Sequence, residues 1–506
     1  MRFFFKPTSY RKGAALAVGA TALWKILSFA NALLIAAYFG AGHATDLYFF
    51  LILMIGVGLY FLQRFNAAVI IPQAMTSEAK TPLSGRPLLN GFLYFYSALA
   101  LCFILIGIFF PLQTIRLFSR FPVDFLIAQK SLITWGFILL GLQILSSYQL
   151  AVLEMYKRFA TALLTPLNAA LPLLFLALLG RRCGIISMMY GFALAHVIQI
   201  LLFSRAMRNE LGWQLTRGQW WHSTTFAQNA FSNQLIEIVV LISGFLPLYL
   251  LSGLSAGIVS ALNYAKQLSE SANEVFTLRL ANVAKIGLTE RIANEQKEAF
   301  NADYLQAHHF LCFLLAPLTV FSIFYAPEIV TIFFKRGAFT ALDVQNTSAF
   351  LRPLLAIMLL LGPCALQNNV VIAVRKIKEF LPYTLIGNVL FIVTLPWAVK
   401  TAGPFAYPYM QLLWGIVGFI INVIFLQKFT PWLATRTSLL DAGRLVSLNI
   451  VSLLPCAIYT WYIAGKNPWG LVLVNGVIFI ATLTALSHYS GDLQRFLRTA
   501  ISRQTV

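Results

Sequence analysis

Charge is scarce in this chain, because Asp, Glu, Lys and Arg make up only 11% of its 506 residues. Ordinary soluble domains carry roughly a quarter. Hydrophobic residues reach 59%, and most of the sequence falls into apolar runs close to the about 20 residues that a bilayer span requires. Because backbone groups inside a bilayer must be bonded within their own segment, such spans are helices. The composition therefore excludes a soluble protein and predicts an all-α polytopic membrane protein.

Motifs for catalysis and for metal binding are also missing. The sequence has no GxxxxGKS or GxxxxGKT loop, which excludes ATP hydrolysis through a P-loop of its own. It has no HExxH or CxxC pattern, and its five cysteines are scattered without metal or disulfide spacing. His308 and His309 are adjacent and would point about 100° apart on a helix, so we expect them to be solvated at a span entrance. We predict no enzyme, no catalytic residue, no bound metal and no cofactor.

The apolar runs predict fourteen spans joined by short loops, with no separate soluble domain. The first run is long and holds Lys25, so we expect a retained helix and not a cleaved signal peptide. The predicted spans are 14–38, 46–71, 88–111, 131–152, 159–180, 184–204, 226–250, 256–283, 308–327, 346–370, 380–399, 405–427, 443–465 and 469–488.

The net charge of +20 is distributed in a way that argues against a nucleic-acid partner. If the N-terminus is cytoplasmic, Lys and Arg concentrate in the cytoplasmic loops, which is the positive-inside pattern. An even number of spans then returns the C-terminus to the cytoplasm. The excess of basic residues therefore mainly sets the orientation of the spans in the membrane, and it also predicts attraction to anionic lipid headgroups.

The few polar residues within spans are the main functional clue, because ionisable groups in a bilayer are costly to keep. Lys25 lies near the middle of span 1, and Asn31 follows it. Asp46 opens span 2 at the non-cytoplasmic edge, and Arg64 lies near its cytoplasmic end. We predict that Lys25 and Asn31 line a cavity and that Asp46 and Arg64 act at a gate; snorkelling to the interface is the alternative for Arg64.

Spans 7 and 8 each carry a polar stripe, because their polar residues recur every three or four positions. A buried salt-bridge lattice is one interpretation of these stripes. The other, which we prefer, is a hydrated cavity, since apolar packing is often as stable as a buried ion pair. The stripe residues are Asn229, Asn233 and Glu237 in span 7, and Asn263, Lys266, Glu270, Asn273, Glu274 and Thr277 in span 8.

Three segments resemble signature stretches of the MviN/MurJ family, the bacterial flippases of the lipid-linked peptidoglycan precursor. Two are residues 39–50 (FGAGHATDLYFF) and residues 334–343 (FKRGAFTALD). The third, residues 262–268 (LNYAKQL), is similar to the family's Tyr-Ala-Asp-Arg-Leu stretch more loosely.

The resemblance implies two pseudo-symmetric helical lobes with alternating access, and two further C-terminal helices that form a lipid-facing groove. On that basis we place the N-terminal lobe (spans 1–6) at residues 1–220 and the C-terminal lobe (spans 7–12) at 221–430. The extra helices and a cytoplasmic tail occupy 431–506. The resemblance also implies a bacterial inner-membrane protein with a cationic cavity for an undecaprenyl-pyrophosphate-linked saccharide.

The chain departs from the family pattern at several positions. Lys25 stands where the family has an arginine, whereas Asn31 and Ala32 replace an Arg-Asp pair. Asp46 matches, and Arg64 is only a rough substitute for a double arginine. In span 8, Lys266 and Gln267 replace an Asp-Arg pair, which shifts the positive charge by one position. These departures favour a cargo other than the peptidoglycan precursor, such as a surface or exopolysaccharide repeat unit.

The expected function is therefore a flippase without its own ATPase, in which Lys25 and Lys266 bind phosphate and Asn31, Asn233 and Asn263 contact sugar. Sodium or proton coupling could use Glu237, Glu270, Asn388 or Asn422. Membrane lipids and a glycan polymerase or glycosyltransferase are the other expected partners. Two alternatives stay open: a cation-coupled multidrug exporter of the same superfamily, and a non-transporting scaffold with a degenerate site.

Overall fold

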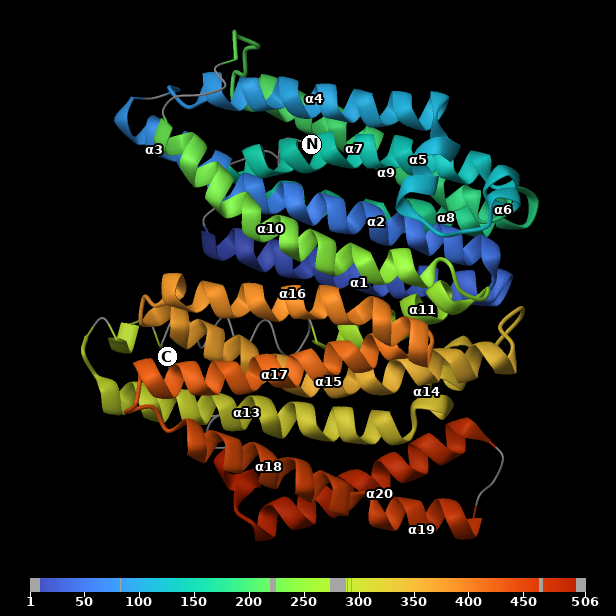
Figure 1. The fold of residues 1–506 in the computed structure, drawn as a ribbon, viewed down its shortest axis with the longest axis vertical. Helices are drawn as coiled ribbons and strands as arrows, with labels where there is room; N and C mark the ends of the chain where they lie inside the picture. Colours follow the sequence, from blue (N-terminus) through green and yellow to red (C-terminus); the bar gives the residue numbers. More distant parts are fainter. Residues whose placement is uncertain are drawn as a thin grey trace. The chain divides into compact units, whose positions relative to one another are not determined.

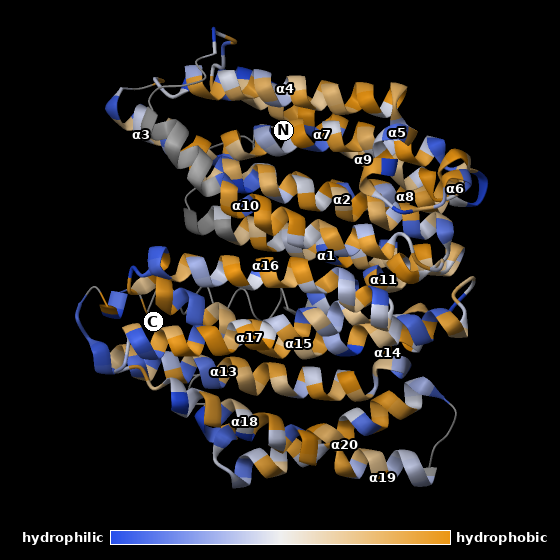
Figure 2. Ribbon diagram, viewed as in Figure 1, coloured by the Kyte–Doolittle hydropathy of each residue, from blue (hydrophilic) through white to orange (hydrophobic). Residues whose placement is uncertain are grey.

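A computed structural model describes residues 10–81, 83–218, 224–273, 288, 290–292, 294–463 and 467–496. Every secondary-structure element within these ranges is a helix (Figure 1). Thirteen helical segments are long and apolar enough to cross a membrane, and Figure 2 shows apolar residues along most of their length. The predicted span 256–283 lies partly outside the described residues, and its described part is α11 (Ile258–Asn273). The prediction of an all-α polytopic membrane protein is confirmed.

The chain divides into two compact units, and each is described by itself. The first comprises Met1–Ser260 together with Arg336–Phe339, and the second comprises Ala261–Lys335 and Thr340–Val506. The lobe boundaries derived from the sequence stay a prediction.

In the first unit, α7 is the central helix, and α2, α4 and α9 pack against it. Helix α10 packs on α2, and α1 packs on α8. Between α2 and α3 the chain forms one turn of π-helix (Asn66–Ile70), a local irregularity that bends long helices. The helices of this unit are α1 (Tyr10–Phe39), α2 (His43–Phe65), α3 (Ile71–Lys80), α4 (Arg86–Phe109), α5 (Pro111–Phe118), α6 (Val123–Ala128), α7 (Lys130–Met155), the 3-10 helix Phe159–Leu164, α8 (Leu167–Cys183), α9 (Ile186–Glu210), α10 (Thr224–Leu251) and the start of α11.

In the second unit, α15 is central, with α13 on one side and α17 on another, and α16 packs on α17. The C-terminal helices α18, α19 and α20 form a layer of their own that contacts α13 and α14 (Figure 1). The helices of this unit are the rest of α11, α13 (Lys297–Phe324), α14 (Ala326–Phe334), α15 (Ala341–Ala373), α16 (Ile377–Ala402), α17 (Ala406–Phe429), α18 (Thr435–Ser452), α19 (Leu454–Ile463) and α20 (Pro468–Tyr489).

The two more specific signature segments are helix boundaries. In residues 39–50, the Thr45 hydroxyl accepts a hydrogen bond from the Gly42 amide at 2.8 Å and so caps the N-terminus of α2. In residues 334–343, Thr340 and Asp343 form a reciprocal capping box at the start of α15. These caps give a physical reason for the residue types found there.

Gly337 is the point where residues 336–339 meet helix α1. The Ala338 amide donates to the carbonyl oxygen of Ala37 at 2.9 Å. Gly337 itself has φ +59°, and a Cβ there would overlap the same carbonyl oxygen. Only glycine combines that backbone conformation with so close an approach.

We therefore expect Gly337→Ala to lower the thermal unfolding midpoint of the purified protein. Backbone strain alone costs about 1–3 kcal/mol, and the overlap with Ala37 adds to it. Gly403→Ala is the matched control, because Gly403 also has a positive φ (+77°) but has no neighbour within 4 Å of the place that a Cβ would occupy. Equal losses in the two variants would show that the contact with Ala37 contributes nothing.

Candidate functional site

Asp46 is the most strongly bonded of the predicted gate residues. It lies in the first turn of α2 with only 2% of its surface exposed. One carboxylate oxygen accepts from the Gly257 amide at 2.6 Å, and the other accepts from the Ser260 amide at 2.7 Å and the Ser260 hydroxyl at 2.6 Å. Gly257 and Ser260 flank the start of α11, so Asp46 caps that helix from a different part of the chain. The carboxylate thus ties the beginning of α2 to the beginning of α11.

Arg64 and Glu237 come together across α2 and α10. The guanidinium Nε of Arg64 lies 3.9 Å from Oε1 of Glu237, and it donates to the Tyr60 hydroxyl at 2.8 Å. The Arg64 side chain is 55% exposed and that of Glu237 only 22%. The sequence suggests different roles for the two residues, gate and cavity. The structure makes them one ion pair in the first unit.

Lys25 and Asn31 share α1 but face different ways, since six residues along a helix correspond to about 600° of rotation. Asn31 is buried, and its amide donates to the carbonyl oxygen of Ala169 on α8 at 2.9 Å. Lys25 is half-buried, with its Nζ 5.0 Å from the centroid of the neighbouring Trp24 ring. The structure therefore places Asn31 in the α1–α8 packing interface and does not bring it together with Lys25.

The stripe on α11 runs from buried to exposed. Asn263 is buried, Lys266 is half-buried and Glu270 is exposed. The Nζ of Lys266 lies 5.9 Å from the centroid of the Tyr407 ring on α17, a cation–π contact that the sequence does not indicate. Both stripes are only partly described. The side chains of Asn229 and Asn233 on α10, and those of Asn273, Glu274 and Thr277 in span 8, lie outside the described residues.

The two asparagines predicted as cation contacts bond in different places. Asn388 donates to the carbonyl oxygen of Thr384, in its own helix α16, at 2.9 Å. Asn422 is buried, and its amide donates to Asn368 Oδ1 on α15 at 3.4 Å. Their roles in ion binding stay predictions.

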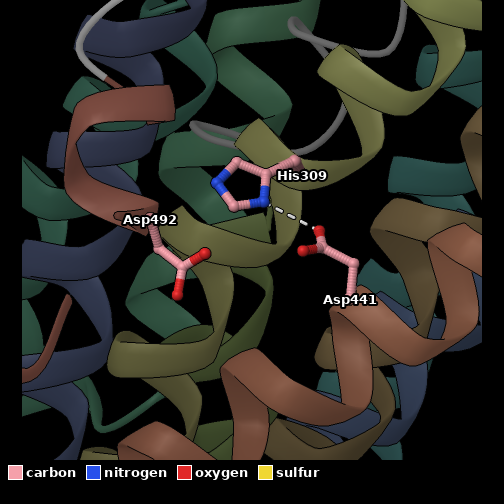
Figure 3. A group of neighbouring side chains, drawn as sticks. All are labelled: His309, Asp441 and Asp492. Carbon is pink, nitrogen blue, oxygen red and sulfur yellow. Dashed lines mark hydrogen bonds and ion pairs between the residues drawn. The ribbon is translucent and has the colours of Figure 1, made fainter. Parts of the chain in front are cut away.

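A buried charged cluster joins α13 to the C-terminal helices (Figure 3). Nδ1 of His309 lies 2.7 Å from Oδ2 of Asp441 on α18. Asp492, just after α20, is completely buried; it accepts from the Ser490 hydroxyl at 2.5 Å and pairs with Arg444 at 3.3 Å. The expectation that His308 and His309 are solvated is wrong, because both residues are buried among the second unit's helices.

Among the described residues, His309, Asp441 and Asp492 are the group whose composition suits a metal ion, with ligand atoms within 4.8 Å of one another. However, Arg444 already neutralises Asp492, and His309 is already bonded to Asp441. We interpret the cluster as a hydrogen bond (His309–Asp441) and an ion pair (Arg444–Asp492) that hold the C-terminal helices against α13.

We expect Asp492→Ala to lower the free energy of unfolding by about 1–3 kcal/mol, the range for hydrogen bonds to a charged group, because it removes a buried carboxylate that the Ser490 hydroxyl and Arg444 share. Each donor keeps one carbonyl acceptor, Ser487 for the Ser490 hydroxyl and Ser490 for Arg444. Thermal unfolding of the purified protein measures the effect. Asp303→Ala serves as the control, since the Asp303 side chain, paired with Arg291, is 38% exposed and surface pairs contribute little. Equal losses would contradict an anchoring role for the cluster.

Sequence reasoning missed the partners of the predicted residues. Gly257, Ser260 and Tyr407 carry no charge, and nothing in the sequence pattern marks them. Asp441 and Asp492 are acidic, but each falls just outside a predicted span and so does not count as an intramembrane charge.

Two comparisons of the sequence with known proteins lead to the same family. A family model described as "Lipid II flippase MurJ" matches residues 35–479. The "Probable lipid II flippase MurJ" of Bdellovibrio bacteriovorus is 25% identical over 333 residues, which cover 60% of this chain and 58% of that protein. The match thus spans less than two thirds of the relative's length.

Solved structures show the same architecture. One titled "Lipid II flippase MurJ, inward closed conformation" has a TM-score of 0.77 at 20% identity, over 95% of this chain and 99% of that one. An inward-facing multidrug resistance MATE family transporter of the MOP superfamily has a TM-score of 0.64 at 12% identity, over 82% and 99%. Likenesses at such low identity concern the fold. The family model, which covers most of the sequence, carries the assignment: the chain belongs to the MurJ family of multi-pass membrane transporters.

Proposed function

We propose that this protein translocates an undecaprenyl-pyrophosphate-linked saccharide across the bacterial inner membrane by alternating access. The family match over residues 35–479 is the observation that carries the proposal. The fold fits it, because helices that cover most of the chain can surround a polar headgroup while a prenyl tail stays in lipid. The sequence offers no P-loop, so the energy for translocation has another source.

Two lysines are proposed to bind the pyrophosphate. Lys25 and Lys266 are cations within spans, and an anionic headgroup needs such charges where the dielectric constant is low. The cation–π contact with Tyr407 orients the ammonium group of Lys266. The N–H donors of that ammonium group can still rotate toward a phosphate. Asn263, three residues away on the same face of α11, and Asn233 are proposed sugar contacts.

The roles of Asn31 and Asp46 follow from their bonds. The amide nitrogen of Asn31 is engaged with Ala169 and its carbonyl oxygen is buried, so the proposed contact of that oxygen with a sugar hydroxyl requires α1 and α8 to move apart. Asp46 is proposed to hold the non-cytoplasmic gate closed through its bonds to Gly257 and Ser260, which would have to break for the gate to open.

Coupling is proposed to use the membrane potential, worth about 2.3 kcal/mol per charge per 100 mV, or a sodium ion or proton. Glu237 and Glu270 are the acidic candidates, with Asn388 and Asn422 as neutral ones. Because Arg64 is the partner of Glu237, a cation at Glu237 would compete with the Arg64 guanidinium. Glu270 is exposed on α11, so the protein leaves room for a cation at its carboxylate.

The cargo is proposed to be a surface or exopolysaccharide repeat unit, or the peptidoglycan precursor. The loss of the family's charge pair at Asn31 and Ala32, and the shift of the positive charge from Gln267 to Lys266, favour the first. Both termini are proposed to be cytoplasmic, where the enzymes that supply the lipid-linked saccharide work, with a glycan polymerase or glycosyltransferase as partner.

Native mass spectrometry of the purified protein with a panel of undecaprenyl-pyrophosphate saccharides tests the proposal. Retention of a saccharide lipid by the wild type, and its loss in Lys25→Ala and Lys266→Ala, would support a flippase and identify the glycan class. Absence of any saccharide lipid from the wild type would contradict it.

A cation-coupled multidrug exporter is the second candidate, favoured by the likeness to a MATE transporter fold and by the acidic residues Glu237 and Glu270. The same experiment separates the two functions, because an exporter would retain organic cations and lose them in Glu237→Gln. A protein that retains neither class would be the non-transporting scaffold.

A further inference from the structure

The first unit contains an apolar groove that the proposed transport function does not use. Helices α4 and α9 each pack along α7, and a cavity of about 630 Å³ is lined by side chains of all three. Tyr94 and Ser97 lie on the α4 wall, Gln149 on the α7 floor, and Ser204 and Arg208 on the α9 wall. That volume is in the range of pockets that take one small organic ligand.

Residues 211–218, which follow α9, line one end of this groove. Trp213 lines the cavity, and its indole nitrogen donates to Asn90 on α4 at 2.7 Å. Asn90 in turn donates to the carbonyl oxygen of Gln214 at 3.0 Å, and the Tyr94 hydroxyl donates to that of Thr216 at 2.9 Å. These bonds fix the segment on α4, so this end of the groove is part of the fold.

The groove has an unsatisfied polar group in its floor. Gln149 is only 4% exposed, and its amide nitrogen donates to the Ser204 hydroxyl at 2.8 Å. Its carbonyl oxygen is buried and accepts no hydrogen bond from the described residues. An acceptor buried in this way calls for a donor from a bound molecule or water.

Charge and exposure indicate what that molecule is. Arg208, in the last turn of α9, is exposed and lines the groove next to residues 211–218. Large apolar side chains lie exposed on the same helices, with Leu101 at 55% and Leu201 at 64% exposure. In a membrane-spanning bundle such a surface faces lipid. Leu101 and Leu201 lie outside the groove, so the groove runs between helices whose exposed surface faces lipid, and Arg208 is the cation among its lining residues.

We propose that this groove binds one anionic phospholipid of the adjacent leaflet. The phosphate pairs with Arg208, one acyl chain lies along the apolar walls, and a headgroup hydroxyl donates to the side-chain oxygen of Gln149. A phospholipid with a glycerol headgroup supplies the required charge and donors together. Basic pockets between helices at the cytoplasmic interface are suited to such headgroups, and the predicted topology places the end of α9 on the cytoplasmic side.

Lipid retention in mixed nanodiscs tests this site. The full-length protein is reconstituted in phosphatidylglycerol and phosphatidylcholine, released, and its bound lipids are counted by native mass spectrometry. Arg208→Gln should reduce retained phosphatidylglycerol about fivefold, as expected for one basic group near a lipid phosphate. Ser97→Phe, which fills the groove without changing charge, should abolish the retention of phosphatidylglycerol.

Arg205→Gln is the matched control, because Arg205 is also exposed near the end of α9 but does not line the groove. It should retain phosphatidylglycerol as the wild type does. Equal retention in all four proteins, or equal loss in both arginine variants, would overturn the proposal in favour of general surface attraction. Displacement of phosphatidylglycerol by undecaprenyl phosphate would overturn it in favour of a site for the cargo's tail. Neither result depends on whether the protein transports a saccharide.

Discussion

Asp46→Ala is expected to give the largest loss of stability of any single substitution in the predicted site. It removes the acceptor of the Gly257 and Ser260 amides and of the Ser260 hydroxyl. A buried donor left without a partner costs about 1–3 kcal/mol, so losing the two amide bonds lowers the free energy of unfolding by about 2–6 kcal/mol. Thermal unfolding of the purified protein in detergent measures the change.

Two further variants test whether the loss of stability comes from the hydrogen bonds of Asp46: Asp46→Asn is a graded change, and Asp124→Asn is a control. Asp46→Asn keeps one acceptor oxygen at this position, so its stability should fall between those of the wild type and Asp46→Ala. Asp124 is exposed in the first turn of α6, so Asp124→Asn should leave the unfolding midpoint unchanged. A wild-type midpoint for Asp46→Ala would show that the cap on α11 contributes little to stability.

Lys266→Ala is expected to have the largest effect on cargo binding. A hydrogen bond to a charged group contributes about 1.5–3 kcal/mol, and about 1.4 kcal/mol corresponds to a tenfold change in affinity. We therefore expect affinity for an undecaprenyl-pyrophosphate saccharide to fall by roughly ten- to a hundredfold. Titration monitored by native mass spectrometry or by a fluorescent lipid analogue measures it.

Two further variants separate charge from packing. Lys266→Arg keeps the cation beside Tyr407 and should keep most of the affinity, whereas Lys266→Met keeps only the packing and should behave like the alanine variant. Lys376→Ala is the control, because Lys376 is a partly exposed lysine paired with Glu379 at 2.8 Å. If Lys376→Ala weakens binding as much as Lys266→Ala, the cation on α11 has no special role.

The spans could be predicted from the sequence because hydrophobicity and length are local properties, and they reappear as thirteen candidate membrane helices among the described residues. The ion pair between Arg64 and Glu237 could not, because it depends on α10 packing against α2. Each residue alone is compatible with snorkelling, gating or ion binding. Only their distance decides that they are partners.

Asp46 was singled out from the sequence, but its partners could not be predicted. The sequence marks it as costly and therefore functional, and its place in a signature segment supports this. Its partners, however, are two backbone amides and a serine hydroxyl more than two hundred positions away. Backbone N–H donors are present in nearly every residue, so the sequence does not show which of them bind a carboxylate. The cluster of His309, Asp441 and Asp492 was missed for a similar reason, because its members come from three parts of the chain that only tertiary packing brings together.

Translocation in vesicles tests the central claim most directly. Purified protein is reconstituted with a fluorescent undecaprenyl-pyrophosphate saccharide, and a membrane-impermeant reductant is added to quench label in the outer leaflet. A flippase brings inner-leaflet label to the outer leaflet, so the fluorescence of wild-type vesicles should be quenched nearly to completion. In protein-free vesicles the inner-leaflet label stays protected, and Lys266→Ala vesicles should keep the same protected fraction. Wild-type vesicles that keep that protected fraction would contradict the account.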